Sequence, residues 1–310
     1  MRQLGADAAA ALDPDVGYVI AAAVRPSGDA FDYSMRTRTS TNPYVEHDRG
    51  PFCPSGTLSA ALAPGATSAT IANLVDQDLV EIGSFAQIGT ELVRVDAWDE
   101  NSGAITIGRG VLGTVAKAHS SGTRIYFRDR FTAVDPTQWV DGETVDVKML
   151  TRTGLGQLAE GSAPSNAVTL DQRAARPYPP GRMRIAATAY PAQLIQQVAA
   201  VTWSHRDRLT QNLQGDESTD IGPEVGTTYS IEVRNADTNA LIDSATGITG
   251  TSHAAPAVHG AFNMRVQLWS VRGGLDSAQR HDFTFWYSYG APPATLTATA
   301  SLIAGTATGS

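Results

Sequence analysis

Residues 89–127 read GTELVRVDAWDENSGAITIGRGVLGTVAKAHSSGTRIYF, and this stretch decides the fold class of the chain. Polar and apolar residues alternate in short segments of it, with the period of two that is typical of half-buried β-strands. These segments cover residues 91–95, 104–107 and 123–127. Turn residues separate them, with Asn-Ser-Gly at 101–103 and Ser-Gly at 121–122. The stretch therefore predicts an all-β unit.

Three glycines in this stretch, Gly108, Gly110 and Gly113, match the G-x-G-x-x-G spacing of a phosphate-binding loop. A phosphate-binding loop needs a helix after its glycines, because the amides of that helix face the phosphate. Residues 114–122 are too short and too broken for a helix. We therefore expect a strand, a turn and a second strand over 105–122, and no nucleotide site.

Short strands continue on the N-terminal side of this stretch. The further candidates are residues 57–62, 68–71 and 85–88, with turns at 64–65 and 88–90. Short strands with turns at this spacing are typical of a small barrel or sandwich. We expect residues 54–128 to form one such unit.

The composition of the 310-residue chain is typical of a globular protein with many turns, since 42% of its residues are hydrophobic and it has Gly 29 and Pro 16. A net charge of −8 gives no general attraction to nucleic acid or to an anionic membrane surface. No apolar run reaches the ~18 residues that a membrane span requires. Asp7, Asp13 and Asp15 interrupt the N-terminal stretch, which makes it a poor signal peptide. We expect neither a nucleic-acid partner nor a membrane span.

Metal and cofactor chemistry finds little support in the sequence. The chain has one cysteine, Cys53, which excludes an intrachain disulfide and a thiolate metal cluster. We expect it to be a small, half-buried apolar side chain. The six histidines are scattered, and His253 and His259 do not have a usual spacing for metal ligands on a helix. The sequence therefore predicts no metal and no cofactor.

Strand patterns also lie on both sides of the barrel unit. Residues 18–24 form a continuous apolar run, which is typical of a buried strand, and residues 31–38 alternate as a half-buried strand does. Residues 139–150 contain a turn followed by a further alternating strand. We therefore predict one β domain over 1–176, with the 54–128 unit inserted into it.

Residues 176–181 read RPYPPG and predict a rigid linker, because proline fixes φ and disfavours both helix and central strand. The sequence after it predicts a fibronectin type III-like sandwich over 177–289. Its strand candidates are 183–188, 198–203, 228–234, 240–244, 262–271 and 281–287. Trp203 ends the second of these and suits the core. Residues 290–310 are rich in Ala, Thr, Gly and Ser, and we expect a tail that is flexible or ordered by a partner.

One string in the sandwich region matches a kinase motif. Residues 205–212 read HRDRLTQN and fit the H-R-D-x-x-x-x-N spacing of the kinase catalytic loop. A kinase also needs a metal-binding D-F-G and a helical lobe. Here Asp282-Phe283 is followed by Thr284, and helical periodicity is scarce throughout the chain. We expect a charged strand end and a loop after Trp203.

A second string, GTSHAAPAVHG at 250–260, looks like the segment that carries the nucleophilic serine of subtilisin-like proteases, with Ser252 as nucleophile. In that family the serine begins a buried helix, and an Asp and a His from earlier segments complete the triad. This chain has neither the H-G-T-H nor the Asp-Ser/Thr-Gly string of that family upstream. A serine hydrolase stays an alternative, and the leading prediction is a protein that is not an enzyme.

The chain as a whole resembles the C-terminal region of tail-tip, baseplate-hub or host-specificity proteins of tailed bacteriophages and of related gene transfer agents. The most specific segment runs from Glu91 to Thr123. The linker RAARPYPP at 173–180 is the second, and TWSHRDR at 202–208 with PEVGTTY at 223–229 is the third. The ring-forming hub domains and the peptidoglycan-cleaving domain of such proteins have no counterpart in this sequence.

This resemblance implies a structural component of a phage tail tip or baseplate, present in the virion and made in the cytoplasm of the bacterial host. Its implied partners are the tail hub, other tail proteins and, indirectly, a host receptor. A homo-oligomer around the tail axis is expected, with a trimer favoured. The exposed loops 211–222 and 247–261 are the candidate contact elements, together with the tail. Their candidate interaction residues are Gln211, Asn212, Asp216, Glu217, Thr251, Ser252, His253 and His259.

A secreted carbohydrate-binding β-sandwich protein is the other class that stays open. Its expected marker is a flat row of exposed aromatic side chains. The candidates for such a row are Trp98, Trp139, Trp269 and Trp286. We expect at least two of them to lie in a core instead.

Overall fold

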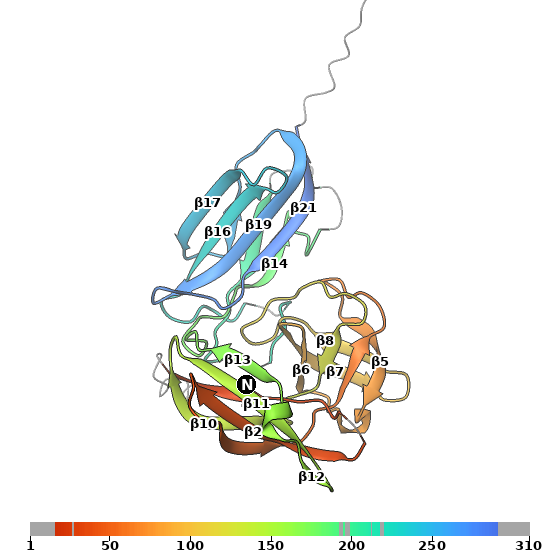
Figure 1. The fold of residues 1–310 in the computed structure, drawn as a ribbon. Coiled ribbons are helices and arrows are strands. Elements are labelled where there is room, and N and C mark those ends of the chain that lie inside the picture. The colour runs from red at the N-terminus through yellow and green to blue at the C-terminus, as the bar shows by residue number, and fades with distance from the viewer. Residues whose placement is uncertain are drawn as a thin grey trace, which may run out of the picture.

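The computed structural model describes residues 16–26, 28–191, 195, 199–211, 213–217 and 220–290. Nearly all of its regular structure is β-strand, so the predicted all-β class is confirmed. Figure 1 shows three parts: a small closed barrel, a group of sheets beside it, and a two-sheet sandwich that carries the later strands. The predicted tail at 290–310 lies outside the described residues, apart from Gly290.

The barrel is closed by six short strands in the order β4-β5-β8-β7-β6-β9. Their bounds are β4 Ser55–Leu58, β5 Ser68–Val75, β6 Phe85–Ile88, β7 Glu91–Asp99, β8 Ala104–Gly108 and β9 Arg124–Tyr126, with the short 3-10 helix η1 Gln77–Leu79 after β5. Five of these strands lie at their predicted positions, but β4 shares only residues 57–58 with the strand predicted at 57–62. Inward-facing side chains such as Ile88, Val93 and Ile107 fill the interior. Closure leaves no free sheet edge, which protects strands this short from pairing with other chains.

The second half of the glycine-rich string differs from its prediction. Residues 109–123 form a long loop after β8, and one isolated bridge between Leu62 and His119 replaces the expected second strand. Gly110 has a φ of +56°, and a Cβ atom there would lie 2.9 Å from the backbone nitrogen of Ala116. This glycine is therefore required for the loop to fold back closely on itself.

The segments on either side of the barrel share their sheets; we call this part the split β domain. Its strands are β1 Val16–Ala21, β2 Ala30–Thr39, β3 Val45–Gly50, β10 Ala133–Val140, β11 Thr144–Thr153, β12 Gly156–Gln157 and β13 Ser165–Thr169, with a 3-10 helix η2 Glu160–Ser162. Strand β1 pairs with β10 and β2 pairs with β11, both antiparallel. The chain thus leaves this domain after β3, forms the barrel and returns at β10 (Figure 1).

Two burial predictions for this part are wrong. The apolar run at 18–24 was expected as a buried strand, but β1 ends at Ala21 and alternates, with Val19 buried and Tyr18 and Ile20 exposed. A two-stranded sheet has one face on the core, so only every second residue of β1 is covered. Cys53 is completely buried rather than half-buried, and burial raises the pKa of its thiol to about 11.

The sandwich packs two sheets face to face, as the fibronectin type III-like pattern predicts. One sheet has the order β14-β15-β18, and the other has the order β17-β16-β19 with β20 and β21 also on β19. The strands are β14 Gly181–Ile185, β15 Ala200–Ser204, β16 Thr228–Asn235, β17 Leu241–Ile248, β18 Ser252–Ala254, β19 Gly260–Arg272, β20 Leu275–Asp276 and β21 His281–Tyr289. Side chains of both sheets meet in one core, among them Ile185, Val201, Ile231 and Val266.

Trp203 lies in this core, with 5% of its surface exposed. Its ring meets the ring of Tyr229 edge-on, at 5.5 Å between centroids and 61° between planes. The prediction that Trp203 is a core residue is confirmed. The linker before the sandwich is itself packed, since Pro177, Pro179 and Pro180 are buried.

Replacing Trp203 by alanine should lower the free energy of unfolding of the sandwich by ~3–5 kcal/mol, because it leaves a large cavity in a packed core. Chemical denaturation followed by circular dichroism measures the loss. Trp286→Ala is the matched control, since 47% of Trp286 is exposed on β21. Equal stability of the Trp203→Ala variant and the unchanged chain would show that this packing is wrong.

A buried junction between the barrel and the sandwich

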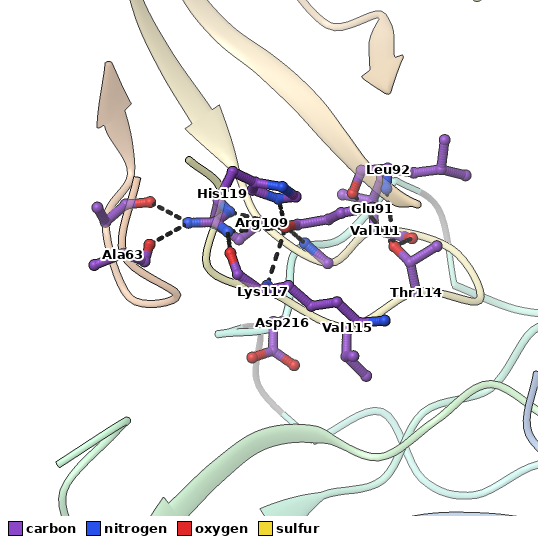
Figure 2. A network of polar contacts seen from close by, with 12 residues as sticks. Ala63, Glu91, Leu92, Arg109, Val111, Thr114, Val115, Lys117, His119 and Asp216 are labelled. Atoms are coloured by element: carbon purple, nitrogen blue, oxygen red, sulfur yellow. Dashed lines mark hydrogen bonds and ion pairs between the residues drawn. The ribbon is translucent and has the colours of Figure 1, made fainter. Parts of the chain in front are cut away.

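The carboxylate of Glu91 is the centre of a buried polar network at the start of β7, and none of its surface is exposed. Its Oε1 accepts hydrogen bonds from Arg109 Nε at 2.8 Å and from the Gly110 amide at 3.0 Å. Its Oε2 accepts from Arg109 Nη2 at 2.8 Å, from the Lys117 amide at 3.1 Å and from His119 Nε2 at 2.8 Å. Figure 2 shows these donors converging on the carboxylate from the loop after β8.

Arg109 uses every N–H group that a guanidinium has. Besides its two bonds to Glu91, Nη1 donates to the carbonyls of Ala63 at 2.7 Å and Ala66 at 2.8 Å. Nη2 also donates to the carbonyl of Lys117 at 2.5 Å. One side chain therefore joins two loops of the barrel, and Figure 2 shows it between them.

The environment of Glu91 determines its charge. Burial opposes ionisation of the carboxyl, but the hydrogen bonds from Arg109 and His119 together outweigh it, so the pKa of Glu91 lies below its ordinary value. Gly110 and Lys117 donate their backbone amides to this carboxylate, so these amides already hold an anion that belongs to the chain. The glycine-rich string thus builds an internal anion site.

The outer side of the same loop receives the sandwich. The amide of Asp216 donates to the Arg109 carbonyl at 2.6 Å. Arg206 Nη1 donates to the carbonyls of Gly110 at 3.0 Å and Thr114 at 3.3 Å. The Arg206 guanidinium lies over the ring of Tyr178 at 5.3 Å, and burial lowers its pKa. Backbone groups of the barrel loop and buried charges of the sandwich therefore form one junction.

Asp216 is bound on several sides within this junction. Its Oδ2 accepts a hydrogen bond from the Tyr190 hydroxyl at 2.7 Å, and its carbonyl accepts one from the Arg182 amide at 2.6 Å. Burial and the nearby Asp216 carboxylate raise the pKa of Tyr190. His281 Nε2 lies 3.7 Å from Asp216 Oδ1 and donates to the Pro180 carbonyl at 2.7 Å. The junction therefore includes β21 and the linker.

The first predicted contact loop is only partly exposed. Gln211 and Asp216 are buried, contrary to the prediction. The Asp216 amide is bound to the barrel loop, whereas Gln211 exchanges hydrogen bonds with Asp207 in its own segment. Glu217 is exposed and pairs with Arg184 at 2.5 Å. Asn212 lies outside the described residues.

The second predicted contact loop contains an edge strand. Ser252 and His253 belong to β18, and the Thr251 carbonyl accepts a hydrogen bond from the Trp203 amide at 3.0 Å. His259 is exposed, and its ring lies tilted against the ring of Tyr289 at 5.7 Å between centroids. Its Nδ1 donates to the Gly290 carbonyl at 2.9 Å. Within the described residues, no hydrogen bond joins the candidates of this loop to those of the first.

The serine-protease string does not form a triad among the described residues. His253 Nε2 lies 2.6 Å from Asp243 Oδ2, which gives a His–Asp pair. Ser252 precedes this histidine on β18, so the two side chains point to opposite faces of the sheet. Ser252 also lies in a strand, where the protease motif requires the start of a buried helix.

The kinase-like string forms a strand end and a local turn. His205 Nδ1 lies 2.7 Å from the Tyr229 hydroxyl, and Asp207 Oδ1 accepts a hydrogen bond from the Leu209 amide at 2.8 Å, which is a local turn.

Across the described residues, no group of three or more His, Cys, Asp or Glu side chains is placed to hold a metal ion. No helix in the described part of the chain is long and apolar enough to cross a membrane.

The four tryptophans do not form one row. Trp98 packs against the barrel core and Trp139 against the core of the split β domain, both only partly buried. Trp269 lies under the guanidinium of Arg280 at 4.4 Å. Trp286 lies opposite Asn263 in the register of β19 and β21. Asn263 is ~20 Å from Trp269 along β19, because an antiparallel strand rises ~3.4 Å per residue.

The sequence interpretation missed the Glu91–Arg109 network, although a signal for it exists. Glu91 shares its strand face with Val93 and Val95, both of which are buried. A carboxylate at an inward position requires a buried cation or several donors. Arg109, inside the glycine-rich string, is the residue that meets this requirement.

No family model and no curated protein matches this chain. Among solved structures, the chain is similar to the crystal structure of chicken CNTN1 FN1-FN3 domains, with 8% sequence identity and a TM-score of 0.22. That similarity covers 76% of this chain and 67% of the other.

Replacing Glu91 by glutamine should lower the free energy of unfolding at pH 7 by ~3–5 kcal/mol, because Arg109 then stays buried without its counter-charge. The pKa of Glu91 is lower in the folded chain than its unfolded value of ~4.3. The stabilisation is therefore present above that value and is lost as the pH falls through the folded pKa. Urea denaturation between pH 7 and pH 3 should show the two proteins converging in acid.

Glu81→Gln is the matched control for this comparison. Glu81 lies on the surface in an ion pair with Arg130, and a pair of that kind is worth ~0–1 kcal/mol. Two results would contradict the role of the buried pair. One is an equal loss of the free energy of unfolding in both variants. The other is a difference between Glu91→Gln and the unchanged chain that persists at low pH.

Proposed function

We propose that this chain is a structural, non-enzymatic component of a bacteriophage tail tip or baseplate. In this proposal it belongs to the virion, assembles with the tail hub and other tail proteins, and supports attachment to the host receptor. It forms a homo-oligomer around the tail axis, with a trimer favoured. The resemblance of residues 91–123, 173–180, 202–208 and 223–229 to such proteins supports the phage assignment.

An exposed apolar ribbon, formed by β1 and β10, is the observation that carries the assembly part of the proposal. Its large exposed side chains are Tyr18, Ile20, Val134 and Val140. Ile20 lies directly opposite Val134 in the antiparallel register, so their side chains share one face. Among the described residues, β1 pairs with β10 and with no other strand. An apolar face beside an open strand edge is a surface that another protein chain can cover.

The way the three parts are joined also supports a structural role. The barrel is inserted into the split β domain, and the Arg206 and Asp216 contacts join it to the sandwich. Buried hydrogen bonds of this kind fix the orientation of neighbouring domains. A part that keeps its shape within a large assembly needs such connections.

Two aspartates on the ribbon, Ile20→Asp and Val134→Asp, should reduce incorporation of the chain into phage particles at least tenfold. Both side chains are exposed, so the melting temperature of the isolated double variant should stay close to that of the unchanged chain. Quantitative immunoblots of purified particles measure incorporation. Leu155→Asp is the control, because Leu155 is fully exposed outside the ribbon.

An antibody against the chain should label the distal end of the tail in electron micrographs of the same particles. Labelling of the capsid would overturn the assignment to the tail. Undiminished incorporation of the double aspartate variant would overturn the role of the ribbon.

The absence of hydrolase activity is tested separately. Ser252 and His253 lie on opposite faces of β18, so Ser252 should not react with a fluorophosphonate probe. In-gel fluorescence and mass spectrometry report labelling, with an active serine protease in a parallel sample as positive control. Labelling that disappears in Ser252→Ala would establish the hydrolase alternative.

A further inference from the structure

A cleft with a volume of about 650 Å³ lies where the barrel, the linker and the sandwich meet. The barrel contributes Leu92 and Leu112 to its wall, the linker contributes Tyr178, and the sandwich contributes Gln279. The cations that line it are Lys117, Arg128, Arg173, Arg176 and Arg208, and no Asp or Glu lies among its lining residues. In a chain with a net charge of −8, this concentrates positive charge at one place.

Two of these cations are already bound. Arg208 Nε donates to both carboxylate oxygens of Glu224, at 3.0 and 2.8 Å. Arg176 donates to the carbonyls of Asp171 at 2.6 Å and Asp276 at 3.0 Å. Arg208 Nη1 also donates to the Ala174 carbonyl, so both arginines join the linker region to the sandwich and their donors are largely in use.

Arg128 and Arg173 differ from them. Arg128 donates from Nε to the amide oxygen of Gln87 at 2.6 Å and lies over the ring of Phe85 at 5.2 Å. Arg173 has one long hydrogen bond, from Nη2 to the Gly113 carbonyl at 3.4 Å. Neither forms an ion pair with a carboxylate within the described residues. Each therefore presents free N–H donors beside the cleft.

The two guanidinium groups also act on each other. Burial lowers the pKa of Arg128, and the positive charge of Arg173 adds to the effect, although Cys53 and Asp129 oppose it. Arg128 and Arg173 both line the cleft, and two like charges at one cleft favour the binding of an anion there. Lys117 is exposed at the same cleft and adds a third positive charge.

We propose that this cleft binds a small ligand that carries two or more oxyanion groups, carboxylates or phosphates. A guanidinium presents paired N–H groups that match the two oxygens of a carboxylate or phosphate. Two or more anionic groups are needed because at least two cations of the cleft lack a counter-ion. The apolar walls at Leu92, Leu112 and Tyr178 lower the local polarity, which strengthens these contacts. The binding site does not depend on the function proposed above.

Isothermal titration calorimetry of the isolated chain tests the site, with pyrophosphate and citrate as probes and sodium chloride at equal ionic strength as reference. The unchanged chain should bind at least one probe with a measurable dissociation constant. Arg173→Gln and Arg128→Gln should each weaken that binding at least tenfold. Arg49→Gln is the charge-matched control, because Arg49 lies on β3 outside the cleft lining and should leave the affinity unchanged.

A carboxylate built into the cleft gives an independent test. A Cβ atom on Gly113 would lie 3.6 Å from Arg173 Nη2 and 3.5 Å from Tyr178 Cδ1, which is ordinary contact. Gly113→Asp should therefore fold normally, place its carboxylate beside Arg173 and abolish binding of the probe. Arg173 is exposed, so its variant should melt as the unchanged chain does.

The outcomes separate the possible ligands and decide the proposal. Binding of pyrophosphate alone assigns a phosphate ligand, and binding of citrate alone assigns a carboxylate ligand. Absence of heat from both probes would overturn the site. Equal affinities of Arg173→Gln and Arg49→Gln would overturn it as well, because binding would then be general attraction to surface charge.

Discussion

The buried ion pair between Glu91 and Arg109 is the interaction on which the arrangement of barrel and sandwich depends. Removing two charges from water costs several kcal/mol for each ion, and their attraction offsets that cost only when the remaining donors and acceptors are satisfied. The structure meets this condition, since Arg109 uses all its N–H groups and Glu91 also accepts from Gly110, Lys117 and His119. The pair therefore fixes the path of the loop after β8 more than it adds net stability.

The inner and outer sides of that loop contact different partners. On its inner side the amides of Gly110 and Lys117 bind the Glu91 carboxylate, and on its outer side carbonyl groups point to the sandwich. The carbonyls of Arg109 and Gly110 accept hydrogen bonds from the Asp216 amide and from Arg206. If the inner side were not held, the outer carbonyls would have no fixed position for these donors. The buried pair in the barrel thus determines where the sandwich docks.

The sequence predicted the elements of the fold far better than the contacts between them. Alternation over two residues depends on local burial alone, so the strands of the barrel and the core position of Trp203 could be predicted. The burial of Asp216 depends on a loop about a hundred positions earlier, and no local pattern records that contact. The strings around Ser252 and His205 match their motifs in spacing alone, and the chemistry of a motif also requires geometry.

Two pairs of arginine residues near the junction differ in how their charges are compensated. Arg109 and Arg208 are paired with buried carboxylates, so their charges are used in holding the fold together. Arg128 and Arg173 form no ion pair with a carboxylate among the described residues, although both line the cleft and Arg128 is partly buried. Stability alone would favour an uncharged side chain at such a position, since an unpaired cation costs free energy when it is desolvated. An anion that enters the cleft from outside, as proposed above, completes the pairing of these two cations.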